Sequence, residues 1–234
     1  MKKILTTAIL CAGLVGFTAC DSFLDEEPKS SLTLDTYYKT SADIIGNVNY
    51  LYRDGAPDKM GNMTGAYRGS SLSVMNMVTG YFVNEYEGQE VDCSYARQLT
   101  RQDFTQSCCN YLTNDTWKSC YKSINVANAV IKYVDGVEMD NQAQYKAEAR
   151  FFRALNYFYL VKMFGDVPMV TEPTEDATLV EYPTRTAASE VFNTVIIPDL
   201  QFAVENLPNA TFAGNSHRVT KYAADMLLAD VYRS

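Results

Sequence analysis

The stretch AQYKAEARFFRALNYFYLVKMFGDVPMV (residues 143–170) decides the fold. Between Tyr145 and Phe164, apolar or aromatic residues occupy nearly every side of a helical wheel. Such a helix either spans a membrane or is buried between other helices. The polar and charged residues that interrupt the run are Arg150, Arg153, Asn156 and Lys162. Because ionised groups are costly in hydrocarbon, we predict a helix buried inside a helical protein, ended by Gly165 and Pro168.

Two further helices are predicted before this one. Thr40-Ser41-Ala42-Asp43 has the T-x-x-D form of a capping box and should open a helix that ends near Gly55. The apolar stripe of that helix is Ile44, Val48, Leu51 and Tyr52. Residues 110–134 form the second helix, which Gly136 closes. Its predicted face is Trp117, Tyr121, Ile124, Asn128 and Ile131. On this face core packing is favoured for Trp117 over a role as a sugar platform.

Two helices are also predicted after it. Residues 186–207 form one, and Pro198 should kink or restart it because proline removes a backbone hydrogen bond. Thr220 caps the last helix, over residues 221–232. The resulting hairpins, 115–164 and 186–232, predict a mainly all-α fold of stacked tetratricopeptide-like helical hairpins within one domain, residues 40–234.

Residues 56–105 are a different kind of sequence, rich in Gly, Ser, Asn and Thr and without a lasting helical period. Long irregular segments inside compact domains are often functional. Aromatic rings on such loops can stack on pyranose rings while polar side chains bond the hydroxyls. The candidate ligand-binding residues are Tyr67, Tyr81, Phe82, Tyr86 and Tyr95. The alternative is that these rings only pack the loop onto the helices.

Residues 1–19 are expected to be a lipoprotein signal peptide. Lys2 and Lys3 precede a short apolar run that suffices for secretion but not for a transmembrane helix. The run ends in small residues before Cys20, as in a lipobox, and residues 20–39 read as an extended, acidic tether. We expect lipidation at Cys20 and a firm membrane anchor. The alternative is an ordinary cleaved signal.

Charge and motifs exclude several function classes. The 234-residue chain has a net charge of −8, and removing Lys2 and Lys3 would leave about −10, which disfavours nucleic acid as a partner. The sequence lacks G-x-S-x-G, P-loop, G-x-G-x-x-G and H-E-x-x-H motifs, and its one histidine, His217, lies in a polar loop. A paired-carboxylate glycosidase remains open, although we read the acidic residues at 85–92 as a solvated or hydroxyl-binding edge.

The cysteines do not predict a metal site. Cys93, Cys108, Cys109 and Cys120 lack C-x-x-C spacing, so no metal or cofactor is expected. An exported protein can oxidise such residues to disulfides, but their pairing cannot be read from the sequence.

Three segments resemble a known family. The runs Ala-Glu-Ala-Arg-Phe-Phe-Arg-Ala (147–154), 157–160 and Phe-Gly-Asp-Val-Pro (164–168) resemble the hallmark segment of the SusD/RagB family. The W-x-x-x-Y and I-N-x-x-N pattern from Trp117 to Asn128 is similar to that family too. Its members are surface lipoproteins of Bacteroidetes that bind nutrients, usually glycans, beside a TonB-dependent transporter.

The resemblance implies a right-handed superhelix of helical hairpins, truncated at its C-terminal end, because these 234 residues correspond to the N-terminal part of a member. A fragment or truncated reading frame is therefore expected. The acidic stretch after Cys20 is similar to a surface-export signal. The implied location is the cell outer membrane, facing the cell surface, with a SusC-like transporter and a glycan as partners. Family ligand contacts come from variable loops, so no binding residue carries over.

Three functions are compatible with these features. A non-enzymatic glycan-binding lipoprotein is favoured by the resemblance and by aromatic loops without a catalytic motif. A helical-repeat scaffold for protein partners and a lipid-anchored glycoside hydrolase are the alternatives. We expect the first.

Overall fold

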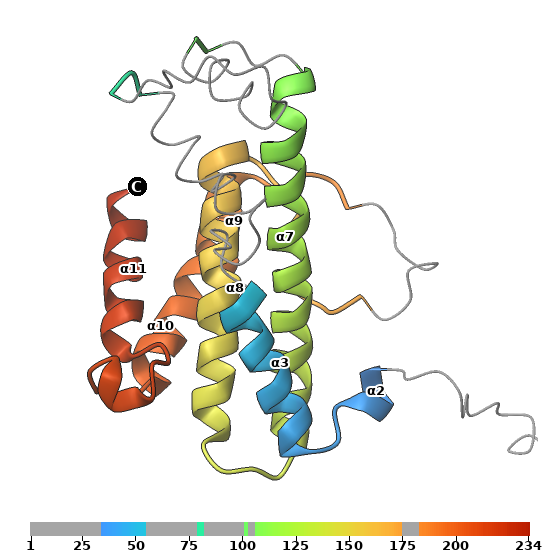
Figure 1. The fold of residues 1–234 in the computed structure, drawn as a ribbon, viewed down its shortest axis with the longest axis vertical. Coiled ribbons are helices and arrows are strands. Elements are labelled where there is room, and N and C mark those ends of the chain that lie inside the picture. Colours follow the sequence, from blue (N-terminus) through green and yellow to red (C-terminus); the bar gives the residue numbers. More distant parts are fainter. Residues whose placement is uncertain (1–33, 55–78, 82–100, 103–105, 175–182) are drawn as a thin grey trace, which may run out of the picture. The chain divides into compact units, whose positions relative to one another are not determined.

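A computed structural model of the chain describes residues 34–54, 79–81, 101–102, 106–174 and 183–234 (Figure 1). The main helices are α2 (Leu34–Tyr37), α3 (Ser41–Asp54), α7 (Gln106–Tyr133), α8 (Gln142–Phe164), α9 (Ala188–Val191), α10 (Ile197–Asn206) and α11 (Lys221–Arg233). Short 3₁₀ turns, η1 (Val134–Gly136) and η3 (Ala213–Asn215), and a π turn, η2 (Phe192–Ile196), complete the order. Strand pairing in these ranges is limited to one bridge, Val167 to Thr186. The predicted all-α fold class is confirmed.

Two hairpins form the body of residues 34–234. α7 and α8 run side by side in opposite directions, and α10 packs against α8 and then against α11 (Figure 1). α3 lies across α7 and α8. α8 is therefore the element that both hairpins and α3 contact.

No helix within the described ranges is long and apolar enough to cross a membrane.

The all-round apolar character of α8 follows from this central position. Phe151, Phe152, Tyr157 and Leu160 are all buried. Phe152 packs edge-to-face on Tyr52 of α3, whereas Tyr157 packs on Tyr121 of α7. Tyr157 is fully buried, and its hydroxyl donates to the carbonyl of Val170 (2.8 Å) and accepts from the Val170 amide (2.7 Å). Burial raises the pKa of Tyr157 to about 12. A phenol that stays neutral at physiological pH can hold the connector after α8 against the core.

The capping box before α3 forms as predicted. The Thr40 amide and hydroxyl both donate to Oδ2 of Asp43, at 2.8 and 2.7 Å, and the Asp43 amide donates back to Thr40 Oγ1 at 3.4 Å. These reciprocal bonds satisfy amides that the first helical turn leaves without partners. They fix where α3 begins.

The segment before the cap differs from the extended tether predicted for residues 20–39. Its last part forms the short helix α2, and Tyr38 is buried. The Tyr38 ring stacks on Tyr133 of α7 with centroids 5.1 Å apart and planes 6° apart. An aromatic stack of this kind adds to area burial and explains why the chain turns onto α7 here. Residues 20–33 lie outside the described ranges.

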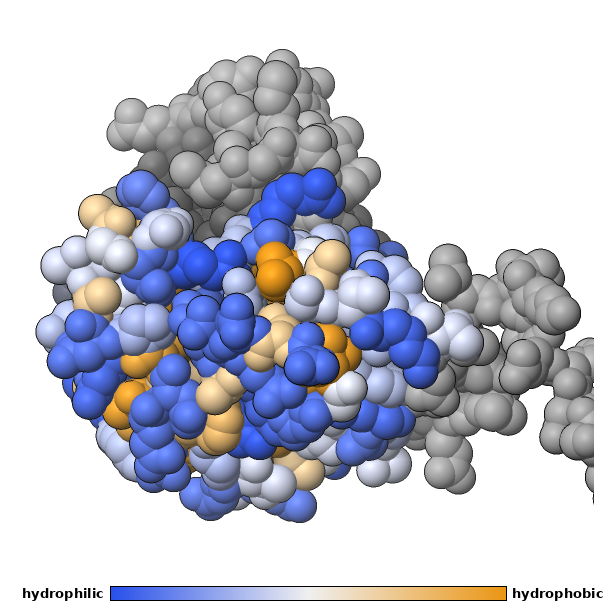
Figure 2. All heavy atoms as spheres, turned by 90° about the horizontal axis from the view of Figure 1, so that it is seen from below, coloured by the Kyte–Doolittle hydropathy of each residue, from blue (hydrophilic) through white to orange (hydrophobic). Residues whose placement is uncertain are grey.

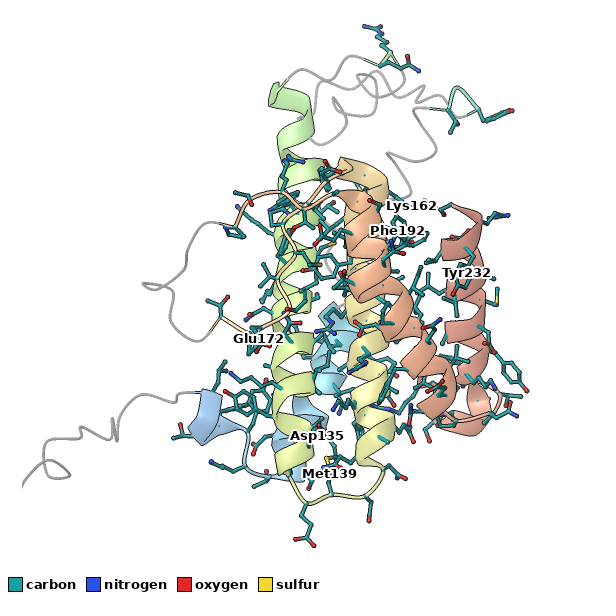
Figure 3. The ribbon with its side chains drawn as sticks, turned by 180° about the vertical axis from the view of Figure 1, so that it is seen from behind. Asp135, Met139, Lys162, Glu172, Phe192 and Tyr232 are labelled. Atoms are coloured by element: carbon teal, nitrogen blue, oxygen red, sulfur yellow. The ribbon has the colours of Figure 1, made fainter. Side chains whose placement is uncertain are left out.

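Pro198 restarts the third predicted helix through a π turn. α9 passes into η2, and the Ile197 amide bonds to the carbonyl of Phe192, five residues back. Pro198 then occupies the first turn of α10, directly after the π turn. Where α8 passes η2, Phe192 packs edge-to-face on Phe158 of α8 with centroids 6.1 Å apart, and the Lys162 ammonium lies 4.7 Å from the same Phe158 ring (Figure 3 labels Lys162 and Phe192). The predicted restart is confirmed. The wider i to i+5 hydrogen bonding of the π turn accommodates the proline within the helical segment.

The Phe-Gly-Asp-Val-Pro motif serves the fold. Gly165 adopts a φ of +67°, Asp166 Oδ1 accepts the Ala188 amide at 2.9 Å, and Val167 pairs with Thr186. The Pro168 carbonyl accepts the Tyr121 hydroxyl at 2.7 Å. An aspartate that receives an amide of the first turn caps α9 from a distant part of the chain. The motif therefore joins the two hairpins.

Candidate functional site

Only one of the predicted ligand-binding aromatics can be placed. Tyr81 is 90% exposed, next to Gly80, whose φ is +78°. Tyr67, Phe82, Tyr86 and Tyr95 lie outside the described residues, as do Cys20, the signal peptide and the acidic residues at 85–92. Whether these aromatic residues converge stays a prediction.

Trp117 is partly buried and packs against the hydrophobic core. Its ring lies edge-to-face on Phe164 at 5.1 Å and tilted against Tyr121 at 5.0 Å. The Arg185 guanidinium lies 6.0 Å from the ring. These contacts confirm that Trp117 packs between α7 and the end of α8.

The described residues contain no assembled acid–base centre around the histidine. His217 is exposed, has a φ of +62°, and sets its ring edge-to-face on Phe212 at 5.2 Å. Cys120 is fully buried in the core, whereas Cys93 and the side chains of Cys108 and Cys109 are outside the described set. Among the described residues, no group of His, Cys, Asp or Glu is arranged to hold a metal ion.

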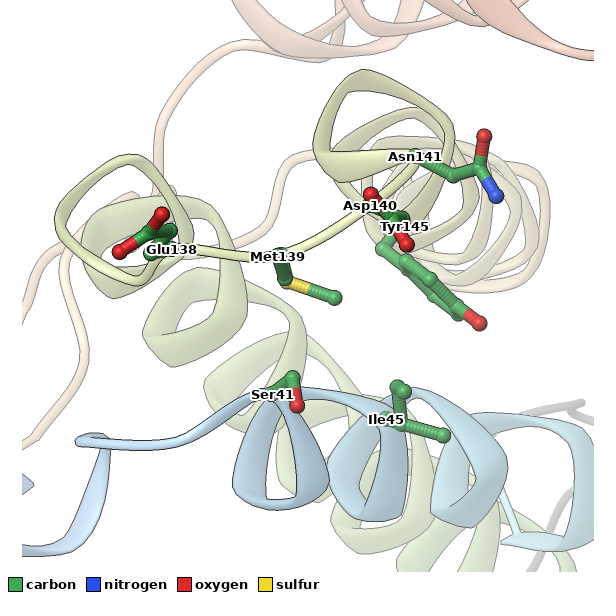
Figure 4. A pocket seen from close by; sticks show the side chains of 7 residues that line it. All are labelled: Ser41, Ile45, Glu138, Met139, Asp140, Asn141 and Tyr145. Atoms are coloured by element: carbon green, nitrogen blue, oxygen red, sulfur yellow. The ribbon is translucent and has the colours of Figure 1, made fainter.

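A pocket of about 710 Å³ lies where the α7–α8 turn faces the start of α3 (Figure 4). It is lined by Ser41, Ile45, Glu138, Met139, Asp140, Asn141 and Tyr145. Met139 points from the turn toward α3, and Tyr145 projects from the first turn of α8 (Figure 4). Ligand sites in proteins commonly have volumes of about 300–1,000 Å³. The pocket is therefore large enough for a small ligand.

The wall of this pocket is held by side-chain hydrogen bonds to the backbone of the turn. The Gln142 side chain donates to the carbonyls of Val134 (2.7 Å) and Val137 (3.0 Å), and Val137 is buried beneath. Asn141 adopts the left-handed conformation, with a φ of +56°. Asparagine tolerates this conformation better than most residues, so the chain can reverse here in few residues.

Tyr145 joins the pocket to a partly buried polar cluster. The Arg218 guanidinium lies 5.3 Å from the Tyr145 ring centroid and 4.7 Å from that of Tyr52. It also binds the fully buried Glu148, with Nε at 3.0 Å from both carboxylate oxygens and Nη2 at 2.5 Å from Oε2. Burial lowers the pKa of Arg218, but Glu148 outweighs it and the net direction is upward. This cluster ties the loop before α11 to α3 and α8.

Sequence reasoning missed both halves of this arrangement. Arg218 is separated from Glu148 by 70 residues, and the pocket combines α3 with residues 138–145. The available signal was Glu148 itself, because a charge on a helix buried on all sides needs a partner. The sequence could not say which residue that partner is.

Comparisons with known proteins place the fold among relatives. A family model named SusD-like and described as "Starch-binding associating with outer membrane" matches residues 22–233. The SusD-like protein P2 of Formosa agariphila is 29% identical over 235 residues, covering 99% of this chain and 43% of that protein.

Two solved structures are also similar to this chain. A SusD superfamily protein from Parabacteroides distasonis is 27% identical with a TM-score of 0.63, covering 81% of this chain and 38% of that one. A structure described as a laminarin-binding SusD-like protein is 25% identical with a TM-score of 0.69, covering 83% and 40%. The chain spans about two-fifths of the length of the curated relatives it matches.

Proposed function

The chain belongs to the SusD-like family, and we propose that it is a cell-surface lipoprotein that captures a glycan for an outer-membrane transporter. The observation that carries this proposal is the family match over residues 22–233, whose description combines starch binding with the outer membrane. The similarity to a laminarin-binding protein supports a glycan as the ligand. The absence of a catalytic motif from the sequence supports binding without catalysis.

We propose that aromatic side chains of residues 56–105 contact the sugar. Tyr81 supports this role because a ring that is 90% exposed costs little to desolvate on one face and can stack on a pyranose. Tyr67, Phe82, Tyr86 and Tyr95 would extend the same surface. A loop origin for the site fits a fold whose family hallmark residues serve packing.

The test is a glycan array probed with the purified chain, followed by titration of the polysaccharide that binds best, with laminarin included. Tyr81→Ala should raise the dissociation constant about tenfold, which is the loss of affinity expected for one stacked ring. Tyr222→Ala is the matched control, because Tyr222 is also exposed (54%) but lies on α11. A folded chain that binds no polysaccharide would contradict the proposal.

The anchor and the partner are separate parts of the proposal. Lipidation at Cys20 predicts that the chain labels with a fatty acid in a Bacteroidetes host and that Cys20→Ala abolishes both labelling and membrane retention. Handover to a SusC-like TonB-dependent transporter predicts co-purification of the two proteins after mild detergent extraction. A chain that takes up no fatty-acid label and stays in the soluble fraction would contradict lipid anchoring. A chain that never co-purifies with the transporter would contradict the handover.

A further inference from the structure

We propose that the pocket between the α7–α8 turn and α3 is a second saccharide site, selective for neutral over acidic sugars. This inference rests on the proposed function, since it assumes that the chain meets glycans. It concerns other residues, because the pocket is formed by the α7–α8 turn and α3. α7 has 28 residues, so about 42 Å of helix separate its first residue, Gln106, from the end that carries this turn.

The side chains that line the pocket suit a sugar ring. Tyr145 and Met139 provide apolar surface, and Ser41, Asn141 and two carboxylates provide hydrogen-bonding groups. Pyranose rings have an apolar face and a rim of hydroxyls, so a binder needs both kinds of group close together. Hydroxyls donate to carboxylates in charge-assisted bonds, which are roughly twice as strong as neutral ones.

The charge of the lining gives the selectivity. Glu138 and Asp140 are both exposed, and the seven lining residues include no basic side chain. The nearby Lys146 is paired with Asp135 instead. A uronic acid or sulfated sugar would place its own negative charge beside these carboxylates, and like-charge contacts suppress wrong partners. Neutral hydroxyls meet no such penalty.

The elements that form the pocket are held in place by other contacts. Gln142 holds the turn, the Thr40–Asp43 box fixes the start of α3, and Arg218 packs on the Tyr145 ring. A preformed site does not lose the ordering entropy that a flexible loop would lose on binding. The end of the molecule that carries this turn is mainly hydrophilic, with small apolar patches (Figure 2). A site there suits a water-soluble chain of sugars more than an apolar ligand.

The test is an NMR titration of ¹⁵N-labelled protein with neutral laminari-, xylogluco- and malto-oligosaccharides, and with oligogalacturonate as the acidic probe. The expected result is that at least one neutral probe shifts the amide signals of Ser41, Met139 and Asp140. Oligogalacturonate should bind at least about tenfold more weakly. Pocket signals that stay unchanged with every neutral probe, or that move equally with the acidic one, would overturn the proposal.

Conservative variants keep the test independent of folding. Glu138→Gln, Asp140→Asn and Asn141→Gly change exposed side chains, and glycine accepts the left-handed φ of residue 141. The triple variant should weaken binding at the pocket about tenfold or more, as expected for lost charge-assisted bonds. Asp225→Asn, on the exposed side of α11, is the matched control and should change nothing.

The two sites fail in different ways. If Tyr81→Ala weakens saccharide binding and the triple variant has no effect, the second site is wrong and the proposed function stands. If the pocket signals shift but Tyr81→Ala is silent, the pocket stands and the loop site is wrong. If no saccharide binds the folded chain in either the array or the titration, both proposals fail.

Discussion

Arg153 of α8 grips both carboxylate oxygens of Asp199 on α10, with Nε at 2.6 Å from Oδ2 and Nη2 at 2.9 Å from Oδ1. Both residues are buried. Arg153 also donates to Asn128 of α7 at 2.9 Å, and Asn128 in turn donates to the carbonyls of Val170 and Glu172. Burial raises the pKa of Asp199, and the hydrogen bonds and charge of Arg153 oppose that rise. One guanidinium thus links both hairpins and the connector between them.

Asp199→Ala should destabilise the fold by about 3–5 kcal/mol, because it leaves the Arg153 charge buried beside Arg150 without its counter-ion. The measurement is urea unfolding followed by helical circular dichroism. Lys162→Ala is the control. It removes a half-exposed pair with Asp230 at 3.9 Å and should cost under about 1 kcal/mol. Equal costs for the two variants would contradict the assignment of Asp199 to the centre of the network.

The Tyr52 hydroxyl makes a second contact between distant segments. It donates to Glu148 Oε2 at 3.0 Å and accepts from the Val219 amide at 2.9 Å. Burial raises the pKa of Tyr52, as does the charge of Glu148, so the group stays a neutral donor and acceptor. Tyr52→Phe keeps the ring against Phe152 and Arg218 but removes both bonds.

We therefore expect Tyr52→Phe to cost about 1–3 kcal/mol and to speed hydrogen exchange at the Val219 amide more than at neighbouring amides. Exchange followed by mass spectrometry or NMR would measure this. Val219 protection that survives the substitution would mean that the loop before α11 is held mainly by Arg218 and Glu148.

The capping box predicts a pH dependence. The hydrogen bonds from Thr40 lower the pKa of Asp43 below its ordinary value of 3.8. The folded state therefore binds fewer protons than the unfolded state in that range. The resulting stabilisation is present above pH 3.8 and is lost as the pH falls through the lowered pKa. Unfolding measured from pH 6 to pH 2.5 should show this loss in the parent protein.

Asp43→Asn should be less stable than the parent at pH 6 and should converge with it at the acid end. Thr40→Val, which lacks the donating hydroxyl, should also flatten the profile. If the stability difference between the parent and Asp43→Asn stays constant across the range, the carboxylate does not act as a charged cap.

The helices could be predicted because their signals are local. The all-round apolar run of α8, the capping box of α3 and the Pro198 restart each depend on residues within a few turns of one another. The first turn of α7 and the helix α2 were missed, because residues 106–109 and 34–37 carry no local apolar period. Tyr38 is held by Tyr133, which lies far along the chain, so local sequence could not reveal it.

Of the two candidate sites, one could be predicted from local sequence and the other could not. The aromatic residues of the segment 56–105 could be proposed from composition alone. The α7–α8 pocket could not, because Ile45 and Met139 meet only after α3 has folded across the hairpin. Glu148 signalled a missing partner, yet the choice of Arg218 depends on the path of the loop before α11. Polar contacts between distant segments carry no periodicity, which is why they escape sequence reasoning.

α11 exposes apolar side chains. Met226 is 76% exposed and Tyr232 is 62% exposed, and Figure 3 shows Tyr232 on α11. Apolar patches of this kind favour association between molecules. Met226→Lys should leave the free energy of unfolding within about 0.5 kcal/mol of the parent and reduce self-association. Light scattering across a concentration series measures the second effect, and unchanged scattering would contradict it.

Two glycines should respond to alanine in opposite directions. Gly165 has a φ of +67°, and apart from its chain neighbours no atom lies within 4 Å of where a β-carbon would be, so the main cost of alanine there is backbone strain. Gly165→Ala should destabilise the protein by about 1–3 kcal/mol. Gly46 lies inside α3, also with open space around its missing β-carbon, so Gly46→Ala should stabilise by about 0.5–1 kcal/mol. Chemical unfolding of both variants decides the matter. If Gly165→Ala were neutral, the junction after α8 would have to adopt another turn, and the contacts of Asp166 with Ala188 and of Val167 with Thr186 would not need the conformation described.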